Sequence, residues 1–281
     1  MKEKTFVFKA KDHLVSKEEF SIYWDGLTEI AHTDFSSSKP IDAYYNSKEY
    51  ASHKADANSL LDQLYKTVQY LMLFLKWKII RPYHQSGSLL DIGAGTGTFA
   101  NFLKRKGFDV EIVEPNSTAI QPYENLLTHY KSIGNVPKTN TFTLITLWHV
   151  LEHLPELDSV FTSFATHLKP FGTLIIAVPN WNSNDAQHYG ADWAALDVPR
   201  HLWHFTPNGL KKLARYHGFE CIAQHPLWFD AFYISYLSER AKGNKPALLL
   251  GVCKGFYFTL KAVFNKRYSS LIFVFKKINS N

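Results

Sequence analysis

The stretch that decides the fold of this 281-residue chain is Leu89-Leu90-Asp91-Ile92-Gly93-Ala94-Gly95-Thr96-Gly97. Its apolar first half predicts a buried strand, and its three glycines predict a tight turn into a helix that continues through Phe99, Phe102 and Leu103. Glycines let a ligand approach the backbone, and the start of a helix offers unpaired N–H groups. We therefore expect a nucleotide-type binding site at this turn.

Two acidic residues narrow the choice of ligand. Glu114 follows the next predicted strand, residues 110–113, where a carboxylate can bind two ribose hydroxyls. Asp91 precedes the first glycine by two residues, and Thr98 stands where the dinucleotide fingerprint has glycine or alanine. A carboxylate this close to the glycine turn would repel a pyrophosphate, but it would attract a ligand that has a cationic amino-acid end. S-adenosylmethionine has such an end, a ribose and an adenine, so we expect it as the cofactor and S-adenosylhomocysteine as the product.

The chain on either side of the glycine turn alternates short apolar runs with helical periods. This alternation favours a parallel, doubly wound sheet. The predicted strands are residues 89–92, 110–113, 142–147, 173–178, 219–223 and 271–275, and helices are expected near 158–168 and 207–217.

From residue 88 to 223, about half of the chain, the sequence resembles the class I S-adenosylmethionine-dependent methyltransferases. The resemblance rests on the glycine stretch, Glu114, residues 147–154 and residues 168–174. It implies an α/β fold with a doubly wound, Rossmann-like, seven-stranded mixed sheet of strand order 3-2-1-4-5-7-6. It also implies a set of cofactor-binding residues, namely Asp91, Gly93, Ala94, Gly95, Gly97, Glu114, Pro115, Trp148 and His149.

The resemblance divides the chain into a cover and a catalytic domain. Residues 1–85 are expected to form an N-terminal cover, with a short strand at 5–9 and a long amphipathic helix that Pro82 ends. Residues 86–281 would form the methyltransferase domain, with 226–268 as a helical insertion before the last strand. Tyr45 and Tyr50 in the cover are expected to act as a lid over the site, unless they pack on the sheet edge.

Two histidine-rich segments follow predicted strands, at the edge where a doubly wound sheet binds ligands. His153 lies in the first, and its ordinary pKa suits a general base for a hydroxyl. The second, residues 192–207, is similar to a stretch in a bacterial branch that resembles the quinone-biosynthesis methyltransferases. We expect His153 and His201 to be catalytic and Trp193 and His204 to contact the substrate, although both segments can equally be packed loops.

The same segments raise the question of a metal. His149, Glu152, His153 and His201 resemble the Glu-x-x-Glu-His plus His site of the small-RNA 2′-O-methyltransferases, and their nitrogen content would favour zinc over magnesium. Here, however, His149 replaces the first glutamate and the second segment has a looser spacing. We therefore expect no metal.

Composition and charge restrict the possible binding partners and the cellular location only loosely. The formal charge of +6 permits nucleic acid, an anionic membrane or an acidic substrate, and two cysteines without C-x-x-C spacing argue against a disulfide framework. No signal peptide is evident, so we expect a cytoplasmic protein. Residues 246–264 are apolar but carry Lys254 and Lys261, which favours packing or a homodimer contact, then peripheral membrane contact, over a membrane span.

These observations predict a methyltransferase for a small-molecule or lipid-linked acceptor, with oxygen more probable as the methylated atom than nitrogen or carbon. One alternative is an RNA-directed, metal-assisted enzyme, but the chain has no dense Lys/Arg run, so no nucleic acid is expected. The other alternative is a protein that binds the cofactor without catalysis.

Overall fold

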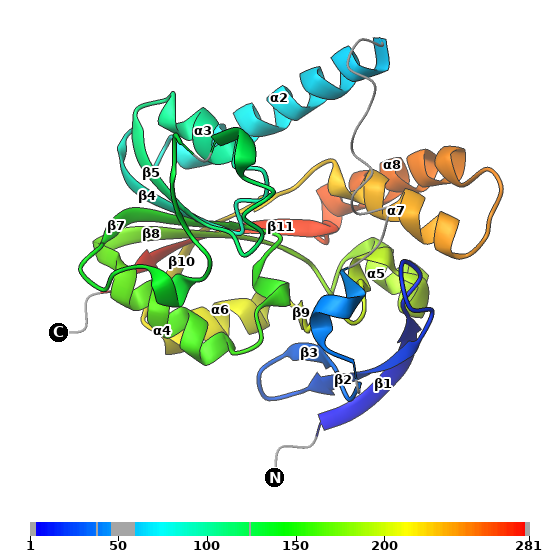
Figure 1. The fold of residues 1–281 in the computed structure, drawn as a ribbon. Helices are drawn as coiled ribbons and strands as arrows, with labels where there is room; N and C mark the ends of the chain where they lie inside the picture. Colours follow the sequence, from blue (N-terminus) through cyan, green and yellow to red (C-terminus); the bar gives the residue numbers. More distant parts are fainter. Residues whose placement is uncertain (1–3, 38, 46–59, 124, 279–281) are drawn as a thin grey trace.

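The fold is seen in a computed structural model that describes residues 4–37, 39–45, 60–123 and 125–278 (Figure 1). Its centre is a seven-stranded sheet in the order β10-β11-β8-β7-β4-β5-β6. The strands are β4 (Gly87–Ile92), β5 (Phe108–Val113), β6 (Thr128–Tyr130), β7 (Phe142–Trp148), β8 (Leu168–Pro179), β10 (Phe219–Pro226) and β11 (Ser270–Lys277). Only β11 runs antiparallel to its neighbours. Read from the other edge, this is the expected 3-2-1-4-5-7-6 order, which is confirmed.

Alternating side chains on the central strands supply two separate cores, one on each face of the sheet. Leu90 and Ile92 pack on one face with α4 (Leu157–His167) and α6 (Pro207–Tyr216). Leu89 packs on the other face with α3 (Thr98–Lys104) and the end of α2 (Leu60–Ile80). Figure 1 shows these helix pairs on opposite sides of the sheet. Strands buried on both faces explain why their sequences read as continuous apolar runs.

A second, antiparallel sheet stands beside the first. Its order is β1-β2-β3-β9, with β1 (Lys4–Lys11), β2 (Glu19–Asp25), β3 (Ile30–Thr33) and β9 (Trp203–Phe205). The sequence predicts β1 and α2 but not β2, β3 or β9, because β9 has only three residues and its pairing partner β3 lies far away in the sequence. The N-terminal segment is thus joined by backbone pairing to the histidine-rich segment.

Two helices fill the expected insertion between the last two strands. They are α7 (Asp230–Ala241) and α8 (Ala247–Asn265), which pack against each other. Close packing is possible because a Cβ at Gly251 or Gly255 would come within 2.4 or 2.6 Å of the α7 backbone at Tyr236 or Phe232. Among the described residues, α8 is the one helix long and apolar enough to cross a membrane, by length and composition. The short helix α5 (Asn184–Tyr189) lies against α8.

Candidate active site

The glycine turn has the backbone that only glycine adopts without strain. Gly93, Gly95 and Gly97 all have positive φ, at 70°, 55° and 74°. The N–H groups of Gly93 and Ala94 donate to the carbonyl of Val113, which fixes the turn against β5. A Cβ at Gly93 would lie 2.3 Å from Val150 Cγ2, whereas one at Gly95 would meet no atom within 4 Å. The turn is therefore crowded on one side and open at Gly95.

Glu114 reaches across to this open side. One carboxylate oxygen accepts the N–H of Gly95 at 2.9 Å, and the other accepts the N–H of Asn116 at 3.0 Å. These two backbone bonds hold the side chain at the carboxyl ends of β4 and β5. A carboxylate so held can bind ribose hydroxyls, as the sequence predicts. Pro115, which follows it, is exposed at the same edge.

Asp91 lies beneath the turn and is only 2% exposed. Thr146 Oγ1 donates to it at 2.6 Å. Burial raises the pKa of Asp91 to about 6, against the opposing effects of this hydrogen bond and of the Lys76 charge. A cationic ligand nearby would favour the ionised carboxylate, as expected for a site that holds an ammonium group.

Lys76 brings a cation from α2 to the same place, a feature that the sequence did not reveal. Its Nζ lies 4.6 Å from the ring centroid of Trp148 and 5.2 Å from that of Phe99. Burial lowers the pKa of Lys76, against the charges of Asp91 and Asp230. The amphipathic pattern of the helix does not predict that Lys76 points into the protein, because the direction of this side chain depends on where the helix crosses the sheet.

Trp148 and His149 end β7 at this edge. The indole Nε1 of Trp148 is buried and has no protein partner among the described residues. His149 adopts a positive φ of 56° and lies between two carboxylates, 3.0 Å from Asp230 Oδ2 and 3.4 Å from Glu152 Oε1. Burial opposes protonation, but the two carboxylates outweigh it and raise the pKa of His149 to about 10. His149 is therefore a fixed cation at physiological pH.

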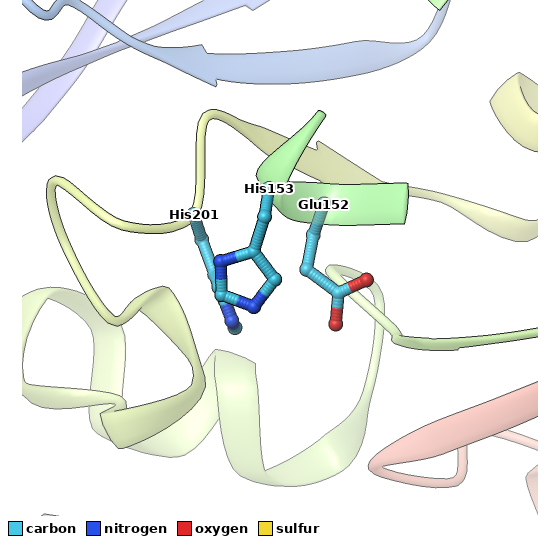
Figure 2. Close-up of side chains that lie close together, drawn as sticks. All are labelled: Glu152, His153 and His201. Atoms are coloured by element: carbon cyan, nitrogen blue, oxygen red, sulfur yellow. The ribbon is translucent and has the colours of Figure 1, made fainter. Parts of the chain in front are cut away.

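Glu152, His153 and His201 converge just beyond this cation (Figure 2). One ligand atom from each lies within 4.8 Å of the others. Glu152 is 1% exposed, and neither of its carboxylate oxygens has a hydrogen-bond partner among the described groups. We call these three residues the His–Glu cluster. The first two come from the 3-10 turn η4 (Leu151–His153), and His201 comes from the loop before β9.

Backbone carbonyls fix the protonation of both imidazoles in the cluster. His153 Nδ1 lies 3.0 Å from the carbonyl oxygen of Arg200, and His201 Nδ1 lies 2.9 Å from that of Ala195. A carbonyl only accepts, so each Nδ1 must carry the proton. Burial and the neighbouring His201 lower the pKa of His153 to about 4, so that imidazole is neutral near pH 7. In the neutral form of each imidazole, the lone pair is therefore on Nε2.

Arg200 connects this cluster to the N-terminal sheet. Its guanidinium is 1% exposed and donates to Asp197 at 2.7 Å, to Asp12 at 3.0 Å and to the Tyr44 carbonyl at 2.9 Å. The hydroxyl of Tyr45 lies 3.1 Å from His153 Nδ1. Tyr45 is thus beside the cluster, as the lid prediction requires, whereas Tyr50 lies outside the described residues.

Trp193 and His204 occupy packed surroundings. Trp193 is 3% exposed and donates its Nε1 to Asp185 at 2.8 Å. Thr33 Oγ1 donates to the His201 carbonyl, so His204 Nε2, 3.0 Å away, donates to that hydroxyl. Burial lowers the pKa of His204 to about 3. In this structure both side chains support the loop that carries His201.

Comparison with known proteins agrees with this geometry. A family model described as a methyltransferase domain matches residues 66–224, which is more than half of the chain. The chain belongs to this methyltransferase family. Its cofactor is S-adenosylmethionine, and the predicted resemblance is confirmed.

Two curated relatives of this methyltransferase are named ubiquinone biosynthesis O-methyltransferase. The protein from Rhodopseudomonas palustris strain BisB5 is 25% identical over 156 residues, which are 50% of this chain and 62% of the relative. The protein from Bradyrhizobium diazoefficiens is 27% identical over 138 residues, which are 44% and 54% of the two chains. The chain therefore spans about half the length of the curated relatives it matches.

A solved structure with the same fold is phosphoethanolamine N-methyltransferase 2 from Haemonchus contortus, in complex with phosphomonomethylethanolamine and S-adenosylhomocysteine. It is 16% identical, has a TM-score of 0.51, and the match covers 75% of this chain and 53% of that chain. At this identity the likeness shows the fold.

The residues of this methyltransferase fit S-adenosylmethionine. The space beside Gly95 is open, the Glu114 carboxylate borders it, and the buried Nε1 of Trp148 has no protein partner among the described groups. When bound, the cofactor supplies an electrophilic methyl group on a cationic sulfur. Asp91 and Glu114 are the carboxylates that would hold its two polar ends.

Proposed function

We propose that this chain methylates a hydroxyl oxygen of a small or lipid-linked acceptor. The observation that carries the proposal is the His–Glu cluster, which offers two imidazole Nε2 lone pairs and a buried carboxylate at the carboxyl end of β7. A hydroxyl needs a group that takes its proton, whereas an already activated carbon does not. The names of the curated relatives support oxygen as the methylated atom.

The His–Glu cluster suits proton uptake because its charged groups are already in place before the acceptor binds. Glu152 carries the negative charge, and the protonated His149 on its far side is held by Asp230. Burial opposes ionisation of Glu152, but the close contact with His149 and the nearby imidazoles keep its pKa below the ordinary value. A proton taken from the acceptor would therefore arrive beside a fixed carboxylate, which stabilises the resulting positive charge.

An apolar cavity and exposed aromatic side chains near the site favour an acceptor that has a hydrophobic part. A cavity of about 250 Å³ lies between α2 and the start of α7, and Lys76 lines it together with mostly apolar side chains. Trp228 and Phe229, which also line this cavity, remain 46% and 49% exposed and directly precede Asp230.

The proposed O-methylation is tested by two measurements on the full chain. Isothermal titration with S-adenosylmethionine should show binding, and Glu114→Gln should weaken it by about 10- to 100-fold, because charge-assisted hydrogen bonds contribute about 1.5–3 kcal/mol. Turnover with a catechol bearing a hydrophobic chain should exceed turnover with the corresponding primary amine. Exclusive N-methylation, or no cofactor binding at all, would contradict the proposal. Binding without any turnover would favour a non-catalytic protein.

We further propose that α8 docks on an anionic membrane surface, where a lipid-linked acceptor would be found. Its apolar side chains point to solvent, namely Leu248, Leu249, Val252, Phe256, Tyr257, Leu260 and Phe264. Between Lys242 and Arg267 the sequence has six Lys or Arg and no Asp or Glu. Two of these six cations pair with carboxylates outside the segment, Lys254 with Glu239 and Lys242 with Asp192. An apolar face beside the remaining excess of positive charge matches anionic lipid better than a second copy of the same positive surface.

Vesicle sedimentation tests this docking. The chain should bind phosphatidylglycerol-containing vesicles more tightly than pure phosphatidylcholine vesicles. Phe256→Glu should weaken binding by at least about 10-fold, since burial of such a side chain contributes about 1.5–3 kcal/mol. Tyr216→Glu is the matched control, because Tyr216 is an exposed aromatic residue on α6. A dimer in solution that Phe256→Glu dissociates, without vesicle binding, would overturn the proposal.

A further inference from the structure

The atoms that the His–Glu cluster offers for proton transfer also have the geometry of a metal site. Two imidazole nitrogens and one carboxylate oxygen lie within 4.8 Å of one another, and all three face a common point (Figure 2). These atoms are close enough that small side-chain rotations would bring them to bonds of about 2.0–2.2 Å around one ion. Three protein ligands would leave further coordination positions open.

The surroundings of the three ligands are those that a metal site requires. In each histidine, Nδ1–H donates to a backbone carbonyl, of Arg200 or of Ala195, which leaves Nε2 as the coordinating nitrogen. The Nε2 of His201 also lies 4.0 Å from Asp197 Oδ2, too far for a hydrogen bond. Outer hydrogen bonds of this kind fix the tautomer and orientation of metal-binding histidines. The carbonyl of Arg200 is itself held in place, because its guanidinium is buried among Asp12 and Asp197.

Glu152 provides an independent observation. It is 1% exposed, and both of its oxygens are buried without a hydrogen-bond partner in the described part of the chain. A buried carboxylate left in this state carries a large desolvation cost. His149 Nδ1 lies 3.4 Å from Glu152 Oε1, beyond a good hydrogen bond, and the same imidazole lies closer to Asp230 Oδ2, at 3.0 Å. A cation at the convergence point would supply the missing partner.

We propose that Glu152, His153 and His201 bind one divalent first-row transition metal ion through a carboxylate oxygen and two Nε2 atoms. Two imidazoles and one carboxylate favour an ion such as Zn²⁺, Co²⁺ or Mn²⁺ over Mg²⁺ or Ca²⁺, which take oxygen ligands. The proposal reverses the expectation of no metal, because the sequence could not show that the three side chains meet. If the proposed O-methylation also holds, the bound ion would take over activation of the acceptor hydroxyl from the imidazoles, because both Nε2 atoms would be coordinated and the ion would lower the pKa of a hydroxyl at an open position.

Metal binding is measured first without any methyl transfer. The full chain, free of a histidine tag and stripped with a chelator, is titrated with Co²⁺ and followed by the visible absorption of the ion. One equivalent should bind, and X-ray absorption of the loaded protein should show imidazole scattering. Absence of a 1:1 complex, or a spectrum of hydrated Co²⁺ alone, would overturn the proposal.

Variants locate the site. Changes to residues that only support metal ligands weaken metal affinity by about 10- to 100-fold. Glu152→Gln and His201→Gln, which each remove a ligand, should weaken Co²⁺ binding by more than that. His167→Gln is the matched control, because His167 is also buried and its Nδ1 also lies 3.0 Å from a carbonyl, that of Asn140, away from the cluster. Equal binding by wild type and both cluster variants would refute the site. Titration of S-adenosylmethionine into the same samples reports folding, so a failed metal site remains distinguishable from a failed methyltransferase.

Discussion

The two ends of the active site, the glycine turn with Glu114 and the His–Glu cluster, lie at the same edge of one sheet but are built differently. The glycine turn is made of backbone, and its contacts join neighbouring parallel strands, β4 and β5. The cluster is made of side chains, and the bonds that position it span 47 residues from His153 to Arg200 and 188 residues from Arg200 to Asp12. The glycine turn is thus local in the sequence, and the His–Glu cluster, the proposed acceptor end, is assembled by tertiary structure.

The largest difference between the two ends should appear when the glycine turn is altered. Gly93→Ala should lower the free energy of unfolding by about 2–5 kcal/mol, since a residue with a Cβ at positive φ costs about 1–2 kcal/mol and overpacking adds about 1–3 kcal/mol. The crowding follows from the 2.3 Å approach of the added Cβ to Val150. Urea unfolding measures the change, and isothermal titration measures the accompanying loss of cofactor binding.

Gly95→Ala is the control for that experiment. Gly95 also has positive φ, but an added Cβ meets nothing within 4 Å. Its cost in unfolding free energy should therefore be limited to the strain of about 1–2 kcal/mol. If both alanines destabilise the protein equally, crowding against Val150 is not what makes the first glycine necessary.

An intermediate effect is expected where the N-terminal sheet supports the cluster. Asp12→Asn should lower the free energy of unfolding by about 2–4 kcal/mol near neutral pH, because it weakens a buried ion pair while Asp197 still faces Arg200. Glu29→Gln, which removes an exposed pair with Lys212, should change little. A loss in Asp12→Asn no greater than in Glu29→Gln would show that the sheet does not need this ion pair.

The Asp12 effect should depend on pH in a defined direction. Burial raises its pKa, but backbone N–H groups and Arg200 outweigh burial and lower the pKa from 3.8 to about 2. A carboxylate with a depressed folded-state pKa stabilises the protein above its unfolded pKa and loses that contribution as the pH falls. The difference in unfolding free energy between wild type and Asp12→Asn should therefore stay constant above about pH 4 and shrink between about pH 4 and 2. A constant difference down to pH 2 would contradict this assignment.

This contrast also explains what the sequence could and could not predict. Six strands of the central sheet and the Asp91–Gly97 turn follow from local periodicity and turn chemistry, whereas the seven-stranded order and the helical insertion follow from the resemblance to the methyltransferase family. Strands β2, β3 and β9, the inward turn of Lys76 and the pairing of His149 with Asp230 do not, because each depends on a distant partner. His153 and His201 could be named as polar residues near the edge, yet only the folded chain brings them to Glu152.

The smallest effect tests how far the cluster depends on the N-terminal segment. The hydroxyl of Tyr45 lies 3.1 Å from His153 Nδ1, whose proton is already shared with the Arg200 carbonyl at 3.0 Å. Tyr45→Phe removes one of two competing contacts, so it should reduce kcat/KM only about 2- to 5-fold, as expected for one neutral hydrogen bond of about 0.5–1 kcal/mol. Cofactor affinity should not change, because Tyr45 contacts His153 in the proposed acceptor end. Tenfold weaker cofactor binding would instead mean that the segment covers both ends and that they are not separate units.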